Sequence, residues 1–516
     1  MLKKIILIFF IFCINIYSKN DFFPLNDINS GMKGYIKTVF DNNLIEKFEV
    51  EVAGITKSAF DIDNINIQDG AVIIKFLDQN CYGPVGGTSG SPLYIDDKLA
   101  GALAYSLGGN NNKYGVVIPI ENILKLSSYT VDKYPKIGMT GKSEIPFFVS
   151  SGSEYISEKI HKNFGVKPVS VPTFFGIDRE GSENLSVEGS PLIVSLVYGD
   201  LVIGALGTLT YRDNNKFFAF GHSVFNLGNV NYFVFNAEII GVVDNREFPY
   251  KIALPEKLLG TVTQDRKYGL YGEFEKYPLI IPVNINFSDF TQGKNTYTYR
   301  IIKNESVFFK VIDSVIYSAF DNVLPNVLSD FYELDLTISY EDEKFNINNF
   351  ELKNIILSPE DELKSKVSSL VYRICSELSK NPFKKVNIIN VKIDVRKNKN
   401  IKKFIIRDYT SFFQRKSNTL IISVNGIEEY AGIKRIDFKI ELPDKFKNQN
   451  FGVKFYSPEF LPFNYFNSFD ELISNLSFFD NDIIVEIIPE MGEDIYKNKI
   501  KTDYFFEGKI SSENNF

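Results

Sequence analysis

Histidine, cysteine and tryptophan are scarce in this sequence. Its 516 residues contain two histidines, three cysteines and no tryptophan. Cys13, Cys81 and Cys375 stand far apart, with no Cys-x-x-C pair and no cluster of cysteine and histidine, so a zinc site is not supported. We expect Cys81 and Cys375 to remain separate thiols, and we expect no metal and no other cofactor.

Basic surface and long apolar runs are also lacking. The formal net charge is −7 and no concentrated basic face is visible, so nucleic acid is not an expected partner. The longest N-terminal apolar run, residues 5–17, is 13 residues long, whereas a membrane-spanning helix needs about 20. Because Lys3 and Lys4 precede it, residues 1–18 are predicted to be a signal peptide, with an uncleaved anchor as the alternative. The sequence therefore predicts export to the periplasm, the cell surface or the medium.

The remaining composition is that of a globular protein with a sizeable core. Hydrophobic residues make up 44% and charged residues 23% of the chain, which needs neither metals nor disulfides for stability. Short alternating segments with glycine-containing turns predict a mainly β fold. The predicted parts are a β half at 19–140, a connection with little structure of its own at 141–190, a second β half at 191–285, a mixed α/β region at 286–380, and a β-sandwich-like region at 381–516. One long helix is predicted after Ser358, with one apolar face formed by Leu363, Val367, Leu370, Val371, Ile374 and Leu378.

The stretch "GGTSGSPLYIDDKLAGALAY", residues 86–105, carries the clearest chemistry. Two strands joined at Asp96-Asp97-Lys98 predict a β-hairpin that supports the glycine- and serine-rich loop before it. A serine nucleophile needs a base and hydrogen-bond donors for the oxyanion. The glycines allow the N–H groups of Gly87 and Ser89 to supply those donors, which makes Ser89 the predicted nucleophile. Ser91 is the rival, although the proline after it restricts its conformation.

The base must come from one of two histidines. His222, in "FFAFGHSVFN", ends an aromatic strand and is the predicted base, whereas His161 lies in a polar segment that we expect to be exposed. The orienting carboxylate is less determined. Asp78, which follows the buried strand "AVIIKF", is the best candidate, and its competitors are Asp61, Asp69 and Asp200.

Four ordered segments within residues 30–280 resemble the SpoIVB-type serine peptidases. They are "LIEKFEVEV" with "AVIIKFLDQ", "GPVGGTSGSPLYIDDKLAGALAY", "GTLTYRDNNKFFAFGHSVF" and "GTVTQDRKYGLYGEF". The resemblance implies a chymotrypsin-like double β-barrel with Ser89 as nucleophile, His222 as base and Asp78 as the orienting carboxylate. The order is reversed, because the serine half precedes the histidine half here, and no PDZ-like segment is visible.

The resemblance also implies a narrow activity. We expect an exported endopeptidase that cleaves partner proteins, or itself, through an acyl-enzyme on Ser89, with a protein or peptide as substrate. Residues 286–516 are a candidate surface for a cell-envelope partner. The alternative is a catalytically inactive protease fold that serves as a binding or scaffold protein, favoured by this long extension and by Thr88 and Ser223 beside the predicted catalytic residues.

Overall fold

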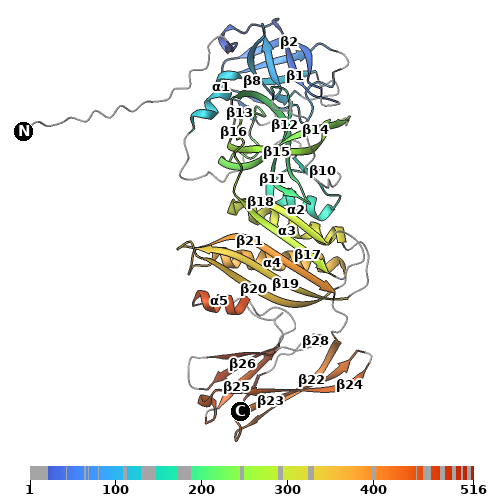
Figure 1. Ribbon diagram of the computed structural model, residues 1–516, viewed down its shortest axis with the longest axis vertical. Helices are drawn as coiled ribbons and strands as arrows, with labels where there is room; N and C mark the ends of the chain where they lie inside the picture. Colours follow the sequence, from blue (N-terminus) through green and yellow to red (C-terminus); the bar gives the residue numbers. More distant parts are fainter. Residues whose placement is uncertain are drawn as a thin grey trace, which may run out of the picture. The chain divides into compact units, whose positions relative to one another are not determined.

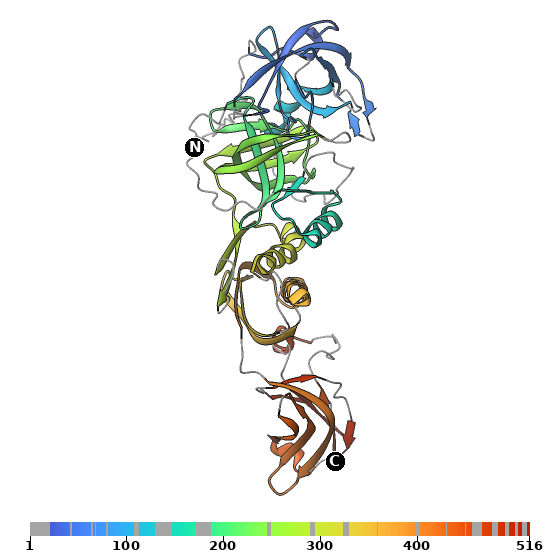
Figure 2. The same ribbon diagram turned by 90° about the vertical axis from the view of Figure 1, so that its right-hand side faces the viewer.

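The chain is mainly β-structure, as the sequence predicted (Figures 1 and 2). It divides into two compact units. The first unit comprises residues 1–148, 176–195 and 203–278, and the second comprises residues 149–175, 196–202 and 279–516. The computed structural model describes residues 21–515 except residues 42–43, 63–64, 68, 79–80, 108–112, 130–146, 172–186, 245–248, 289–294, 324–329, 359, 398–401, 430, 449, 457–466, 477–482, 491–494, 501–503 and 508–512. The predicted signal peptide lies outside the described residues.

Six strands of the first unit form a closed barrel in the order β1-β2-β5-β8-β7-β6. Their bounds are Lys33–Thr38 (β1), Glu46–Thr56 (β2), Ala71–Phe76 (β5), Pro92–Ile95 (β6), Lys98–Ser106 (β7) and Tyr114–Pro119 (β8). A two-stranded ribbon of β3 (Phe60–Ile62) and β4 (Ile65–Ile67) and the short helix α1 (Ile120–Leu124) belong to the same part of the chain. The alternation in β2 buries Phe48, Val50 and Val52 and leaves Glu49 exposed, so one face of the strand fills the barrel.

The hairpin predicted behind the serine loop is confirmed. Strands β6 and β7 are antiparallel partners, and Ile95 pairs with Lys98. The two residues between them, Asp96 and Asp97, have φ angles of 48° and 58°. Positive φ at both central positions is the geometry of the tight turn that matches the twist of the strands, and aspartate tolerates it better than most residues do.

A second group of strands, which lies in the first unit except for residues 196–199 of β11, carries the predicted histidine half. Its strands are β11 (Pro191–Gly199), β12 (Ile203–Asp213), β13 (Lys216–Ala219), β14 (Gly228–Val243), β15 (Tyr250–Arg266) and β16 (Gly269–Phe274). Neighbours pair in the order β12-β13-β16-β15-β14-β11, and β11 also pairs with β12. The pairings therefore return to the strand on which they began.

The predicted connection at 141–190 contains more structure than we expected. Its described residues form β9 (Phe147–Val149), α2 (Glu154–Phe164) and β10 (Val169–Ser170). Ile156, Ile160 and Phe164 recur every fourth residue and are buried, and Gly165 ends the helix with a φ of 71°. The expectation of little structure was wrong for α2, because the polar residues between these three positions hid the helical period.

The second unit contains two long helices and a mixed sheet, in which β18 also pairs with residues 197–199 of β11. The strands follow the order β18-β17-β21-β19-β20, and β17 and β21 are parallel. The bounds are Ile280–Ser288 (β17), Thr296–Ile302 (β18), Glu305–Val323 (α3), Asp330–Asp342 (β19), Ile347–Ser358 (β20), Glu360–Lys380 (α4) and Val386–Lys397 (β21). Helices α3 and α4 lie together on one side of this sheet (Figure 2).

Helix α4 is the long helix that the sequence predicted. Five of its six predicted face residues are buried, namely Leu363, Val367, Val371, Ile374 and Leu378, and Leu370 is half-buried. Strand β21 departs from the predicted division, because it pairs with β17 and β19 and so joins the mixed sheet rather than the C-terminal region. The mixed region therefore ends near Lys397.

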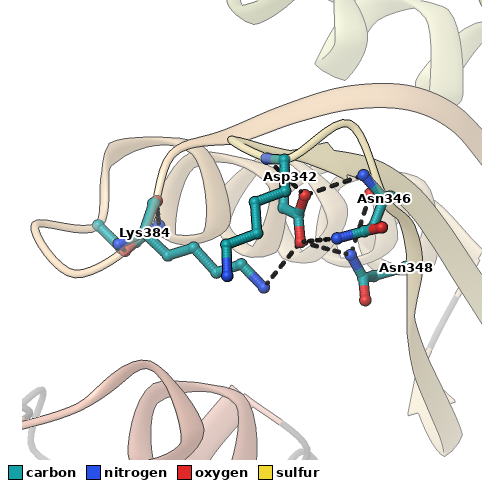
Figure 3. A network of polar contacts seen from close by, with 6 residues as sticks. Asp342, Asn346, Asn348 and Lys384 are labelled. Atoms are coloured by element: carbon teal, nitrogen blue, oxygen red, sulfur yellow. Dashed lines mark hydrogen bonds and ion pairs between the residues drawn. The ribbon is translucent and has the colours of Figure 1, made fainter.

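A polar network closes the turn between β19 and β20 (Figure 3). The Asp342 carboxylate accepts hydrogen bonds from the backbone N–H groups of Lys344 and Asn346, each at 2.9 Å, and lies 3.4 Å from Nζ of Lys384. The Asn346 N–H and the other donors lower the pKa of Asp342 to about 2. This arrangement is that of an Asx turn, and we assign it a structural role.

The C-terminal residues form two four-stranded sheets around one core. The sheet orders are β24-β23-β22-β28 and β27-β26-β25-β29. The bounds are Lys402–Gln414 (β22), Thr419–Glu428 (β23), Gly432–Glu441 (β24), Phe451–Tyr456 (β25), Phe469–Leu476 (α5), Ile483–Pro489 (β26), Tyr496–Ile500 (β27), Tyr504–Glu507 (β28) and Glu513–Asn515 (β29). Both sheets contribute to this core, for example through Leu420 and Val424 on one side and Val453 and Val485 on the other.

Candidate active site

The serine loop lies between the end of β5 and the start of β6, and two glycines give it its shape. Gly87 and Gly90 have φ angles of 92° and 94°, a region that side chains with a Cβ rarely adopt. The N–H of Thr88 donates to the carbonyl of Val85 at 2.9 Å, and the N–H of Ser91 donates to the carbonyl of Thr88 at 3.0 Å. The loop is therefore two successive turns with the predicted nucleophile in the second.

Two N–H groups of this loop are left available. The carbonyl of Gly86 accepts from the N–H of Lys251 at 2.9 Å, and the opposite side of that trans peptide carries the N–H of Gly87. The carbonyl of Thr88 likewise points at Ser91, so the N–H of Ser89 points away from it. Among the described residues neither N–H has an acceptor. They are the two donors that the sequence predicted for an oxyanion.

Strand β12 holds the other face of the loop. The N–H of Thr208 donates to the carbonyl of Ser89 at 2.7 Å, and its hydroxyl donates to the carbonyl of Gly87 at 3.1 Å. The hydroxyl of Thr210 donates to the carbonyl of Gly90 at 2.7 Å. These bonds hold three loop carbonyls on β12, two of them in peptide groups adjacent to those that carry the N–H groups of Gly87 and Ser89.

The two serines of the motif differ sharply in their surroundings. Ser89 is 8% exposed, and its Oγ has no hydrogen-bond partner. Ser91 is fully buried, and its Oγ donates to the carbonyl of Thr88 at 2.6 Å and lies 3.5 Å from Oγ1 of Thr208. An unpartnered buried hydroxyl costs free energy, and Oγ of Ser190, Ser195 and Ser314 shares this state, so it distinguishes Ser89 from Ser91 but is not specific to a reactive group. The geometry favours Ser89 over Ser91 as the nucleophile.

His222 follows β13 and is held in one orientation. Its ring is 4% exposed and stacks on Tyr105 of β7, with the ring centroids 5.6 Å apart. Nδ1 lies 3.0 Å from the carbonyl oxygen of Ser223, and because a carbonyl only accepts, Nδ1 carries the proton and Nε2 is left as an acceptor. Burial lowers the pKa of His222 to about 4, so the imidazole is neutral at pH 7.

The fold brings the serine and histidine segments together. A Cβ added to Gly90 would lie 2.4 Å from the backbone nitrogen of Phe220, two residues before His222. The N–H of Gly90 also donates to the carbonyl of Leu103 at 2.6 Å, and a Cβ on Gly221 would lie 3.1 Å from the same oxygen. The two side chains are nevertheless not hydrogen-bonded to each other, because Oγ of Ser89 has no partner. Hydrogen bonds of this kind are often looser before substrate binds.

No contact between Asp78 and the imidazole is found among the described residues. Asp78 is exposed in the segment after β5, where its charge acts on Cys81. Burial is the main cause that raises the pKa of the Cys81 thiol to about 11, and Asp78 adds to it. In the part of the chain that the structure describes, His222 contacts the Ser223 carbonyl, its own backbone carbonyl and the rings of Tyr105 and Phe220, none of which is a carboxylate.

The other predicted competitors are also elsewhere. Asp69 accepts the hydroxyl of Tyr268 at 2.8 Å, and Asp200, which belongs to the second unit, accepts the N–H of Thr298 at 2.6 Å. The side chain of Asp61 lies outside the described residues. His161 is exposed on α2, as the sequence predicted.

A carboxylate that was not among the candidates predicted from the sequence lies directly behind the histidine loop. Asp265, on β15, is fully buried, and its two oxygens accept the N–H groups of Val224 and Phe225, each at 2.8 Å. The hydroxyl of Tyr232 adds a third donor at 3.1 Å, and the N–H of Leu227 adds a fourth. Burial raises the pKa of Asp265 to about 6 despite these donors. Asp265 could have been noticed in the sequence as a charged residue within the predicted strand "GTVTQDR".

A buried lysine lies behind the serine loop. Lys251 is 4% exposed, its Nζ donates to Oγ1 of Thr38 at 2.9 Å, and it lies 5.0 Å from the centre of the Phe40 ring. Burial lowers the pKa of Lys251 to about 7. Since its backbone N–H pairs with Gly86, this residue joins the serine loop to β15. The sequence hinted at this residue only through a lysine in the alternating strand "YKIALPE".

Neither a metal cluster nor a membrane-spanning helix is present in the part of the chain that the structure describes. No three His, Cys, Asp or Glu side chains there are grouped as metal ligands, and no helix there is both long and apolar enough to cross a bilayer. Comparisons of the chain with protein-family models, with curated proteins and with solved structures found no match.

Proposed function

We propose that the chain is a serine endopeptidase of narrow specificity. The observation that carries this proposal is the serine loop itself. An unpartnered hydroxyl on Ser89 and two unpaired N–H groups, of Gly87 and Ser89, lie in a loop that packs on the segment leading to His222. A nucleophile, oxyanion donors and a neutral imidazole are the three components that acyl transfer needs.

The proposed fold is a chymotrypsin-like pair of barrels in reversed order. The closed barrel β1-β2-β5-β8-β7-β6 would be the serine half, and the strands whose pairings return to β11 would be the histidine half. The order of the halves does not matter for the chemistry, because catalytic triads are defined by geometry and not by chain order.

In the proposed mechanism, Oγ of Ser89 attacks the carbonyl carbon of the scissile peptide bond. Nε2 of His222 takes the hydroxyl proton and returns it to the leaving amine, and the N–H groups of Gly87 and Ser89 bind the oxyanion. Water then releases the acyl group by the same steps. The Ser223 carbonyl, which lies on Nδ1, orients the imidazole in the place where Asp78 was expected. Substrate binding has to bring Nε2 within hydrogen-bond reach of Oγ.

We further propose that the protein is exported, that its substrate is a protein or peptide, and that residues 286–516 bind a cell-envelope partner. The scaffold alternative is favoured by one observation, which is the missing hydrogen bond between Ser89 and His222.

A fluorophosphonate probe decides between these functions. We expect the wild type to be labelled, and Ser89→Ala and His222→Ala to lose the label. Ser91→Ala and His161→Ala are the matched controls and should keep it. Equal labelling of Ser89→Ala and the wild type would refute the assignment, and absence of labelling in the wild type would favour the scaffold.

A further inference from the structure

We propose that Asp265 is the positioning residue of this site and acts on His222 through a single peptide group. The inference rests on the proposed function, because it assigns the role of the triad carboxylate to a residue that does not touch the imidazole. The link is the peptide between Ser223 and Val224. Its carbonyl oxygen lies 3.0 Å from Nδ1 of His222, and its N–H donates to Oδ1 of Asp265 at 2.8 Å.

A peptide group transmits both orientation and polarity. It is planar, so fixing its N–H on Asp265 also fixes the direction of its carbonyl towards His222. A carboxylate on the N–H polarises the group and makes the carbonyl oxygen a better acceptor, because hydrogen bonds in a chain strengthen one another. The chain of hydrogen bonds from the imidazole through the peptide group to the carboxylate therefore runs in the same direction as in a direct imidazole–carboxylate pair, with one peptide group inserted.

The surroundings of Asp265 indicate that its charge serves the loop. Its partners are backbone N–H groups of residues 224, 225 and 227 and the hydroxyl of Tyr232. Tyr232 is the one titratable side chain among these partners, and no cation is among them. The neighbouring Arg266 points instead to Gln264 and to the ring of Tyr129. A buried carboxylate without a cation is costly, and here each of its contacts except Tyr232 fixes the segment that follows His222.

The direct test is the tautomer of His222, read by nitrogen NMR of the imidazole. The chain has two histidines, so a His161→Gln background leaves one imidazole to observe. We expect a single tautomer at pH 7, with the proton on Nδ1. Asp265→Asn places an amide N–H₂ against a backbone N–H, and it should give a mixture of tautomers with the fold retained. Tyr232→Phe removes a side-chain donor but leaves the peptide link, so the single tautomer should persist.

The rate of probe labelling provides the second readout. Asp265→Asn should label about tenfold more slowly than the wild type at pH 7, a smaller loss than the roughly 100-fold or more expected from removing an acid–base group itself. Tyr232→Phe should stay close to the wild-type rate. Burial raises the pKa of Asp265 to about 6, so the wild-type rate should also fall as the pH drops through 6. The labelling rate of Asp265→Asn should show no fall between pH 7 and pH 5.

The outcomes separate this inference from the proposed function. A single Nδ1–H tautomer in folded Asp265→Asn would overturn the positioning role. If Asp265→Asn does not fold, protonation of Asp265 in the wild type between pH 7 and pH 5 removes the same charge, and an unchanged tautomer there would overturn it equally. If the wild type does not label but its tautomer depends on Asp265, the positioning role stands and the peptidase proposal fails.

Discussion

Gly90 of the serine loop lies against Phe220 of the histidine segment with no room for a side chain. A Cβ on Gly90 would be 2.4 Å from the backbone nitrogen of Phe220 and 2.1 Å from the carbonyl oxygen of Thr208. The Phe220 nitrogen and the Thr208 carbonyl oxygen belong to the backbone, and the added Cβ is attached to it, so none of the three atoms can move aside without distorting the main chain. The two segments that carry the proposed nucleophile and base are thus in contact through their main chains.

Gly90→Ala should therefore be severely destabilising. We expect a loss of at least about 3 kcal/mol in the free energy of unfolding, from the strain of a positive φ and from overpacking. Gly31→Ala is the matched control, because Gly31 has a φ of 85° and nothing within 4 Å of the added Cβ. It should lose only about 1 kcal/mol. Equal losses in urea titrations of the two variants would show that the two segments are not packed as described.

The sequence was most informative where side-chain pattern and backbone geometry agree. Asp96 and Asp97 marked the turn of the β6–β7 hairpin because few residues tolerate positive φ, and the regular apolar face of α4 marked a helix. The short strands made a mainly β fold predictable. Helix α2 was missed because its buried face consists of only Ile156, Ile160 and Phe164.

The serine and histidine of the candidate site could be selected from the sequence, but the carboxylate beside the histidine loop could not. Ser89 and His222 were found because serine between glycines and a histidine at a strand end are distinctive. The carboxylate was not, because Asp265 meets His222 through a peptide group, and no residue pattern encodes which carbonyl an imidazole will bind. A lysine such as Lys251, buried without a carboxylate partner among its hydrogen bonds, is likewise a product of tertiary packing.

Substitutions of the two serines of the motif should have different effects: Ser91→Ala should change stability, and Ser89→Ala should change activity. Ser91→Ala removes a buried hydroxyl that donates to the Thr88 carbonyl, so it should lower the free energy of unfolding by about 1 kcal/mol and keep probe labelling. Ser89→Ala removes a hydroxyl without a partner, so it should abolish labelling with little loss of stability. Denaturant unfolding and labelling of the same two preparations test both statements. The reverse pattern would make Ser91 the nucleophile.

The imidazole of His222 should titrate well below the ordinary range. Burial lowers its pKa to about 4 from 6.5, so its carbon-bound ring proton should show an NMR titration midpoint near pH 4. Tyr105→Ala uncovers the face of the ring that Tyr105 stacks on, and it should move the midpoint upward. His161→Gln assigns the signal. A midpoint above 6 in the wild type would mean that the ring is solvated and not held as described.

Lys251 should make the stability of the protein depend on pH above neutrality. Its pKa is about 7 in the folded chain and ordinarily 10.5, so between these values the unfolded chain binds the extra proton. Stability therefore rises as the pH rises from 7 towards 10.5 and falls again over the same window as the pH is lowered. Below about 7 it changes no further, because Lys251 is then protonated in both the folded and the unfolded chain. Between pH 7 and pH 9 this contribution is about 2 kcal/mol.

Lys251→Met should remove that dependence, because methionine fills a similar volume and does not titrate. At pH 7 the variant should be at least as stable as the wild type in spite of the lost hydrogen bond to Thr38, and at pH 9 the wild type should have gained on it. Lys75→Met, at an exposed position on β5, is the control and should keep the wild-type slope. Urea titrations at pH 7, 8 and 9 measure the difference. Parallel pH profiles for wild type and Lys251→Met would show that Lys251 keeps its proton inside the fold.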